Sequence, residues 1–267
     1  MVIDFHTHIF PDKIAAKTVE KLEEVGSVKA YTDGTLQGLK ESMRESNVTL
    51  SVVLPVVTRP SQFDTVNSFA AAINGKDGII SFGGIHPDTE DYYLKLKEIK
   101  KMGLAGIKLH PDYQETFIDD PRMIRIIQYA TELDLMVIIH AGLDIGLPNP
   151  IHCPPKRTVA MLNQIEKESA RIVLAHMGGY DMWEEVEEYI VGKNVWLDTG
   201  YVLGHISDEQ FVRIVKNHGA DRVLFASDSP WGGQKEALEK IRKLDLNVEV
   251  MDRLLYKNAQ ELLGNVI

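Results

Sequence analysis

Short apolar, β-branched runs alternate with amphipathic segments of helix length along the whole sequence, and this alternation constrains the fold most. Most of the runs are continuously apolar, as expected for strands buried on both faces of a parallel sheet. The predicted strands cover residues 2–8, 50–57, 79–86, 105–110, 135–140, 171–176, 194–198 and 222–228. The predicted helices cover residues 36–46, 61–74, 91–102, 121–133, 157–167, 182–191, 207–217 and 234–244, with further helices at 12–25 and 250–263.

Eight strand–helix units of roughly 30 residues each indicate an α/β protein with a parallel sheet. A doubly wound open sheet could be built from the same pattern. The (β/α)8 TIM barrel is favoured because it has eight units and typically about 250 residues, and this chain has 267. Because no Gly/Ser-rich linker, low-complexity tract or charge block divides the sequence, we predict a single domain over residues 1–267.

Charge and composition exclude several classes of protein. The chain carries 29 basic and 39 acidic side chains, a formal charge of −10, which disfavours nucleic acid as a partner. No run of eighteen apolar residues and no signal-peptide pattern occurs, so neither a membrane span nor secretion is expected. Cys153 is the single cysteine, which fits a reducing compartment. We therefore expect a cytoplasmic enzyme or binding protein.

Polar side chains follow the ends of the predicted strands. In a barrel the carboxyl ends of all strands open on one face, and active sites are built there. Six of the nine histidines lie at such ends, namely His6, His8, His86, His110, His140 and His176, and Asp198 and Asp228 end the last two strands. This clustering is the strongest indication of function in the sequence.

His6 and His8 are two residues apart on the first predicted strand, so their side chains should point the same way, into the barrel. Two adjacent imidazoles suit a transition metal such as zinc, iron or manganese. A pair of structural polar residues is the alternative. Asp4, just before them, and the other strand-end histidines favour a metal site.

Five motifs together resemble the amidohydrolase superfamily. They are IDFHTH at 3–8, VIIH at 137–140, LAHMGG at 174–179, LFASDSP at 224–230 and NAQELL at 258–263. The sequence is most similar to the amidohydrolase-2 branch, which contains aminocarboxymuconate semialdehyde decarboxylase and related decarboxylases and hydrolases. The motifs are specific for the superfamily and do not identify a substrate.

The resemblance implies one divalent metal ion, with His6, His8, His140 and Asp228 as ligands. Zinc is the expected ion, and manganese or iron are alternatives. Asp228 would be the fourth ligand or would bind the metal-bound water, which also makes it a catalytic candidate; a helix N-cap is its structural alternative. The resemblance makes His176 the catalytic residue that orients or deprotonates this water, and an imidazole can do so at neutral pH.

Lys108 and His110 should both point inward from the fourth strand, and we expect both to contact the substrate. Lys108 has three candidate roles: holding a substrate carboxylate, forming a buried ion pair, or bridging two metals as a carbamate, as in binuclear amidohydrolases. His86 fits a substrate contact and a structural turn equally well.

Three arginine and histidine side chains in loops are further candidates for substrate binding. Arg59 and Arg157 could each clamp a carboxylate with two hydrogen bonds. The Gly- and Pro-rich segment 142–155 is long enough to act as a lid, and His152 within it could touch the substrate. Cys153 has no catalytic partner pattern around it, so it is not expected to be a nucleophile.

The leading functional prediction is a metal-dependent hydrolase that acts on a small molecule bearing a carboxylate through metal-activated water. A metal-dependent decarboxylase of the same branch is the alternative, and a non-catalytic metal-binding barrel is a third. Hydrolysis is favoured because the inward cation is Lys108, whereas arginine orients a departing carboxylate better. A homodimer would allow a partner chain to supply such an arginine.

Overall fold

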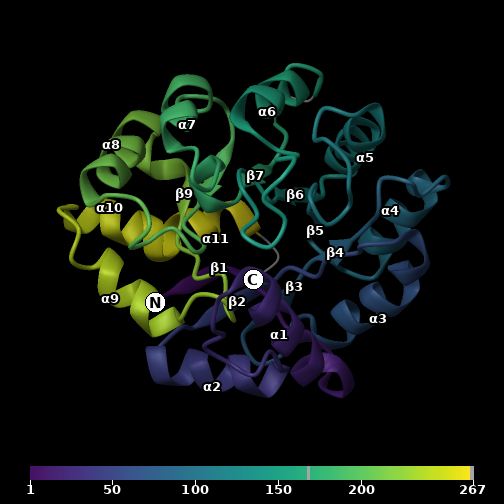
Figure 1. Ribbon diagram of the computed structural model, residues 1–267, viewed down its shortest axis with the longest axis horizontal. Coiled ribbons are helices and arrows are strands. Elements are labelled where there is room, and N and C mark those ends of the chain that lie inside the picture. Colours follow the sequence, from purple (N-terminus) through teal and green to yellow (C-terminus); the bar gives the residue numbers. More distant parts are fainter. Residues whose placement is uncertain (167–168, 265–267) are drawn as a thin grey trace.

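The computed structural model describes residues 1–166 and 169–264, and it forms a (β/α)8 barrel, as predicted. In Figure 1 the helices surround the central strands and follow one another around the ring in chain order. The strands are β1 (Ile3–Thr7), β2 (Leu50–Val53), β3 (Ile79–Ser81), β4 (Gly83–Gly84), β5 (Gly106–Leu109), β6 (Met136–Ile139), β7 (Ile172–Leu174), β8 (Trp196–Asp198) and β9 (Val223–Leu224).

All the strand pairs are parallel, and they form two sheets, β1–β2–β3 and β4 to β9 in order. Backbone hydrogen bonds close the barrel between its first and last strands. The N–H of Phe5 donates to the carbonyl of Phe225 (2.9 Å), and that of Asp228 donates to the carbonyl of His6 (2.9 Å). The two ends of the sequence therefore meet at one seam.

The predicted strand 79–86 is wrong as a single strand, because it divides into β3 and β4 at Phe82. β3 pairs with β2, whereas β4 pairs with β5. The amide of Asn67 accepts from the N–H of Gly84 and donates to its carbonyl, both at 2.9 Å. A Cβ on Gly83 would lie 2.6 Å from Asn67 Oδ1, so the close approach of this side chain requires glycine. The two short strands together occupy one of eight barrel positions.

The helices lie close to the predicted ranges, and their ends differ by a few residues. The predicted helix 61–74 begins with a 3-10 turn, and the closing helix is interrupted by a π-turn. Part of the predicted helix 157–167 lies outside the described residues. The helices are α1 (Asp12–Gly26), α2 (Leu36–Ser46), η1 (Pro60–Gln62), α3 (Phe63–Ile73), α4 (Tyr92–Lys101), α5 (Pro121–Glu132), α6 (Pro155–Leu162), η2 (His176–Gly178), α7 (Trp183–Tyr189), α8 (Asp208–His218), η3 (Ala220–Arg222), α9 (Gln234–Ile241), α10 (Val248–Asp252), η4 (Arg253–Lys257) and α11 (Asn258–Leu263). Within the described residues, none of these helices is long and apolar enough to cross a membrane.

Two hydrophobic layers hold the barrel together. One layer lies between the strands and the surrounding helices. The other fills the barrel interior with alternate strand residues, including Phe5, Phe82 and Ile138, and α11 packs against it. Polar side chains replace this inner layer at the carboxyl ends of the strands, where the candidate site lies.

Candidate active site

A β-bulge in β1 directs the first two histidines into the barrel. Asp4 pairs with Ser51 and Thr7 with Val53, so β1 has one extra residue in this interval. Phe5 belongs to the apolar interior, and strict alternation would therefore turn His6 outward. The extra residue restores the inward direction of His6.

His6 and His8 meet Asp228 at the mouth of the barrel, as predicted. His6 Nε2 lies 3.1 Å from His8 Nε2, and Asp228 Oδ1 lies 3.3 Å and 3.2 Å from these two atoms. The opposite ring nitrogens are occupied: His6 Nδ1–H donates to Asp198 Oδ2 (2.9 Å) and His8 Nδ1–H donates to the Leu54 carbonyl (2.8 Å). The two Nε2 lone pairs therefore face each other.

This donor set fits a divalent metal ion. Two lone pairs and a carboxylate oxygen that converge favour a positive charge among them, which Lys108 Nζ supplies at His6 Nε2 (3.1 Å) and a bound cation would supply to all three. Tetrahedral ligands about 2.0–2.1 Å from zinc lie about 3.4 Å apart, close to the distances between His6, His8 and Asp228. We call these three residues the primary site; they form one of two groups in the described chain with the spacing of metal ligands.

Electrostatics keep the primary site ready to bind a cation. Burial opposes ionisation of Asp228, but the neighbouring His6, His8 and His176 hold its pKa at about 2. Burial, assisted by the charge of Lys108, lowers the pKa of His6 well below its usual range. The carboxylate is therefore charged and the His6 imidazole is neutral at pH 7, as metal ligands must be.

His176 lies beside the primary site, and both of its ring nitrogens have partners. Its Nδ1–H donates to the Gly200 carbonyl (2.7 Å), and its Nε2 lies 3.0 Å from His140 Nδ1. Both His176 (φ 59°) and Asp228 (φ 65°) have left-handed backbone conformations, which are uncommon outside glycine. Such conformations concentrate at functional sites, where the surrounding structure imposes them.

Lys108 is fully buried and lies against the primary site. Its Nζ is 3.1 Å from His6 Nε2. Burial lowers the pKa of Lys108 to about 8, although the charges of Asp198 and Asp228 act in the opposite direction. Within residues 1–166 and 169–264 it forms no direct ion pair with a carboxylate, so the predicted structural ion pair is not observed. Substrate binding and carbamylation both remain compatible with its position.

His140 stands apart from the primary site. Its ring stacks on that of His110, with centroids 4.1 Å apart and planes inclined by 10°. While Nδ1 faces His176, Nε2 faces two carboxylates, Asp112 (3.8 Å) and Asp144 (4.0 Å). The sequence reasoning missed both aspartates, although their positions two residues after His110 and four after His140 place them beside the strand ends.

The loop residues proposed to bind substrate lie outside this cluster or have other partners. Arg59 is exposed, and its backbone N–H donates to Gln62 Oε1 (3.2 Å). Arg157 Nη1 pairs with both carboxylate oxygens of Asp119 (2.7 and 3.0 Å). Neither arginine is seen to reach the primary site, and their roles as carboxylate clamps stay predictions.

Two further predicted residues have structural partners. His152 Nδ1 lies 3.0 Å from Asp112 Oδ1. His86 Nδ1 accepts from the N–H of Asp88 (3.1 Å), which fits the structural turn. Cys153 is buried, and burial raises the pKa of its thiol to about 12, so it is poorly suited to nucleophilic chemistry.

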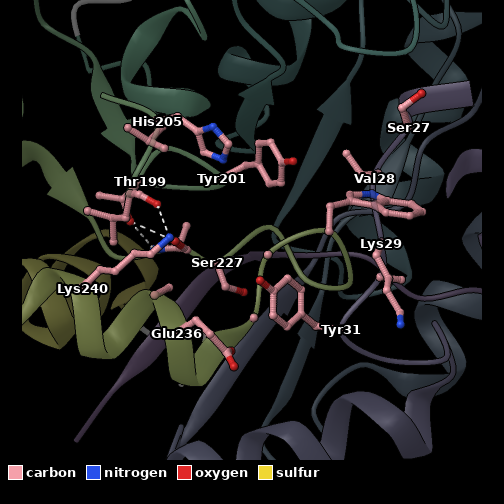
Figure 2. Close-up of a pocket in the computed structure, with 18 residues that line it drawn as sticks. Ser27, Val28, Lys29, Tyr31, Thr199, Tyr201, His205, Ser227, Glu236 and Lys240 are labelled. Carbon is pink, nitrogen blue, oxygen red and sulfur yellow. Dashed lines mark hydrogen bonds between the residues drawn. The ribbon is translucent and has the colours of Figure 1, made fainter. Parts of the chain in front are cut away.

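A cavity of about 710 Å³ lies beside the cluster on the same face of the barrel. Its wall includes Thr199 and Ser227, which directly follow or precede Asp198 and Asp228 in the chain. Figure 2 shows Tyr31 and Tyr201 on two sides of this cavity. The imidazole cluster does not line the cavity, which therefore adjoins the primary site without containing it.

The chain matches a protein-family model over almost its whole length. The model, described as Amidohydrolase (the amidohydrolase-2 family), covers residues 3–264. The chain belongs to the amidohydrolase family. It is thus an enzyme of a metal-dependent family, and the resemblance drawn from the motifs is confirmed. Among curated proteins, no sequence matches this amidohydrolase.

Solved structures similar to this amidohydrolase share its fold across their full length. An uncharacterized TIM-barrel protein from Bordetella bronchiseptica is 18% identical, with a TM-score of 0.78 and 99% of each chain covered. A putative 2-pyrone-4,6-dicarboxylic acid hydrolase from Pseudomonas putida is 18% identical (TM-score 0.67; 98% of this chain and 97% of that chain covered). A dihydroxybenzoic acid decarboxylase from Polaromonas, with bound manganese, is 15% identical (TM-score 0.71; coverage 98% and 96%). The neighbours thus include hydrolases and decarboxylases.

Proposed function

We propose that this amidohydrolase is a metal-dependent hydrolase of a small molecule that bears a carboxylate. The observation that carries the proposal is the convergence of His6 Nε2, His8 Nε2 and Asp228 Oδ1, with Nδ1 of both rings already in use. Three protein donors leave positions open, as catalytic sites do. We infer that His140 completes the ligand set through Nδ1, the ring atom on the side of His176.

We assign a separate role in the reaction to each residue around the ion. A divalent ion bound here supplies a Lewis acid that polarises a carbonyl group and lowers the pKa of a water molecule. His176 accepts the proton of the attacking water at Nε2, because Nδ1 donates to Gly200. Asp228 orients this water with its second carboxylate oxygen. Lys108 binds the substrate carboxylate, with His110 beside it.

The cavity next to the site suits the rest of the substrate. Its volume of about 710 Å³ is that of a small-molecule pocket. Tyr31, Tyr201 and Trp231 offer ring faces, while the exposed Lys29 offers a positive charge. This lining supports a substrate that combines an unsaturated or aromatic body with an anionic group. His152 at the loop 142–155 and Arg59 remain candidate contacts for the same substrate.

We propose zinc as the ion, because imidazoles with one carboxylate are its usual catalytic donors, with manganese or iron as alternatives. A second ion bridged by a carbamate on Lys108 is the binuclear alternative. We also propose a cytoplasmic location, one domain over residues 1–267, and a homodimer as the candidate assembly, with no nucleic-acid or membrane partner.

Decarboxylation is the second candidate function, and the manganese-bound decarboxylase among the structural neighbours favours it. The same metal ligands and His176 could serve both reactions. Hydrolysis is preferred because Lys108, a point charge, is the inward cation near the site, whereas an arginine fork would hold a carboxylate in a fixed orientation.

Metal content tests the primary site. After dialysis the protein should retain about one equivalent of divalent metal, and the His6→Ala/His8→Ala double variant should lose it. His176→Asn should keep this metal but lose roughly 10²–10⁴-fold in turnover, as expected for loss of a general base. His86→Asn is the matched strand-end control and should keep the metal. Loss of the metal from His176→Asn would make His176 a ligand instead.

A paired assay with the metal restored tests the reaction class. Turnover of a lactone or amide bearing a carboxylate, without release of carbon dioxide, is the expected result. Carbon dioxide release from a carboxylated aromatic substrate, abolished by Asp228→Asn and weakened by Arg59→Ala or Arg157→Ala, would establish the decarboxylase instead.

A further inference from the structure

Behind His140, on the side away from His176, polar atoms of His110, Asp144 and Asp112 lie close to its Nε2 or to one another. Asp144 Oδ2 lies 3.5 Å from His110 Nε2 and 4.0 Å from His140 Nε2, while Asp112 Oδ2 lies 3.8 Å from His140 Nε2. All four side chains are buried. The ligand atoms of His110, His140 and Asp144 all lie within 4.8 Å of one another, the spacing expected around a metal ion.

Hydrogen bonds do not explain this convergence. The distances exceed those of hydrogen bonds, and within the described residues Asp112 Oδ2 and His140 Nε2 have no hydrogen-bond partner. The other carboxylate oxygens are used: Asp112 Oδ1 accepts from the N–H of His152, and Asp144 Oδ1 accepts from the N–H of Gly146 and Leu147. These hydrogen bonds to Oδ1 fix the two carboxylates, and their Oδ2 atoms are directed toward the imidazoles of His110 and His140.

The carboxylates of Asp112 and Asp144 have no lysine or arginine partner in the described part of the chain. Within 4.0 Å in the described chain, the basic partners of each carboxylate are imidazoles alone. Burying carboxylates without a compensating charge is costly.

We propose that His110, His140, Asp112 and Asp144 form a second divalent cation site. Two imidazole nitrogens and two carboxylate oxygens suit zinc, manganese, iron or cobalt. The three distances His110 Nε2–Asp144 Oδ2, His140 Nε2–Asp144 Oδ2 and His140 Nε2–Asp112 Oδ2 are 3.5, 4.0 and 3.8 Å, against about 3.4 Å between the ligands of a tetrahedral ion. His110, His140 and Asp144 form the compact part of the site, and Asp112 joins it on the side of His140.

His140 links this second cation site to the primary site. It presents Nδ1 to the side of His176 and Nε2 to the two aspartates. When both ions use the ring, His140 must give up its ring proton, so the second ion binds more weakly than the first. The same ion joins Asp144, in the loop 142–155, to Asp112 in the segment after β5. It therefore ties that loop to the mouth of the barrel.

A metal titration of the full-length protein tests this proposal. Metal-free protein titrated with Co²⁺ should bind a tight and a weaker equivalent, and the weaker one should add its own visible absorption. Asp144→Asn and Asp112→Asn should each abolish the weaker equivalent and keep the tight one. Asp119→Asn, which removes the nearby carboxylate that pairs with Arg157, is the matched control and should keep both.

The opposite set of variants separates this proposal from the primary site. The His6→Ala/His8→Ala variant should lose the tight equivalent and still bind the weaker one. Binding of a single equivalent by the folded wild-type protein would overturn the second cation site. So would a second equivalent that survives in both aspartate variants, with a mass gain expected for a carbamate on Lys108. If the double histidine variant keeps the tight ion, the primary site is wrong instead. Circular dichroism of each variant confirms that it is folded.

Discussion

At the scale of single residues, His218 offers a test of buried histidine outside the site. Its Nε2–H donates to the Val195 carbonyl (2.9 Å), and its Nδ1 accepts from the N–H of Gly192 (3.2 Å). Burial lowers its pKa in the folded protein. The unfolded chain, with a histidine pKa of about 6.5, takes up a proton first as the pH falls. The free energy of unfolding should therefore fall below about pH 6.5, and the contribution of His218 should be complete above it.

Replacing His218 by glutamine should reduce this acid sensitivity by up to about 1.4 kcal/mol per pH unit. The measurement is urea unfolding of the metal-free protein near pH 7.5 and near pH 5.5, for the wild type and His218→Gln. Other buried histidines contribute equally to both proteins. An equal acid-induced loss of stability in the two proteins would show that His218 titrates normally in the folded state.

Much of the site could be predicted at this scale, because strand-end position is readable from sequence. His6, His8 and Asp228 meet as expected. Which nitrogen of His140 faces the primary site could not be predicted from the sequence, because the ring orientation depends on the hydrogen-bond partners of each nitrogen. Asp112 lies in a turn after β5, and sequence periodicity carries no information on where turn side chains point.

At the scale of elements, the turn after β6 depends on one glycine. Gly142 has a φ of 86°, and a Cβ there would lie 2.1 Å from the backbone nitrogen of Tyr180. Gly142→Ala should therefore cost at least about 3 kcal/mol, from left-handed strain and backbone overlap together. Gly103→Ala is the matched control, because Gly103 has a φ of 76° with open space around it. It should cost only about 1–2 kcal/mol.

Denaturant unfolding of the two alanine variants checks this difference. Equal losses in the free energy of unfolding would mean that the turn can move away from Tyr180. The strand–helix order that places such turns was predictable from apolar runs. The bulge in β1 and the break at Phe82 were not, because both depend on contacts with distant segments, such as the amide of Asn67 at Gly84.

At the scale of the whole molecule, stability should depend on the metal. An ion that binds only the folded chain stabilises it by about 4 kcal/mol when free ion is a thousandfold above its Kd. For a chain of this size, that corresponds to roughly 10 °C in Tm. Calorimetry with and without a chelator measures this shift, and the His6→Ala/His8→Ala variant should lose most of it. An unchanged wild-type Tm after complete metal removal would contradict the linkage.

The primary site forms only when β1 and the segment after β9 come together, so the seam between β1 and β9 determines when the protein can bind its ion. Asp4 accepts from the N–H of Ser227, 223 positions away in the chain (2.9 Å), and Asp228 brings the only carboxylate of the primary site from the same late segment. Contacts so distant in sequence form late in folding, and a nascent chain on the ribosome has not yet made them. Metal acquisition is thus a step that follows synthesis of the ninth strand, and the rate of metal uptake by refolding protein reports the closing of the ring.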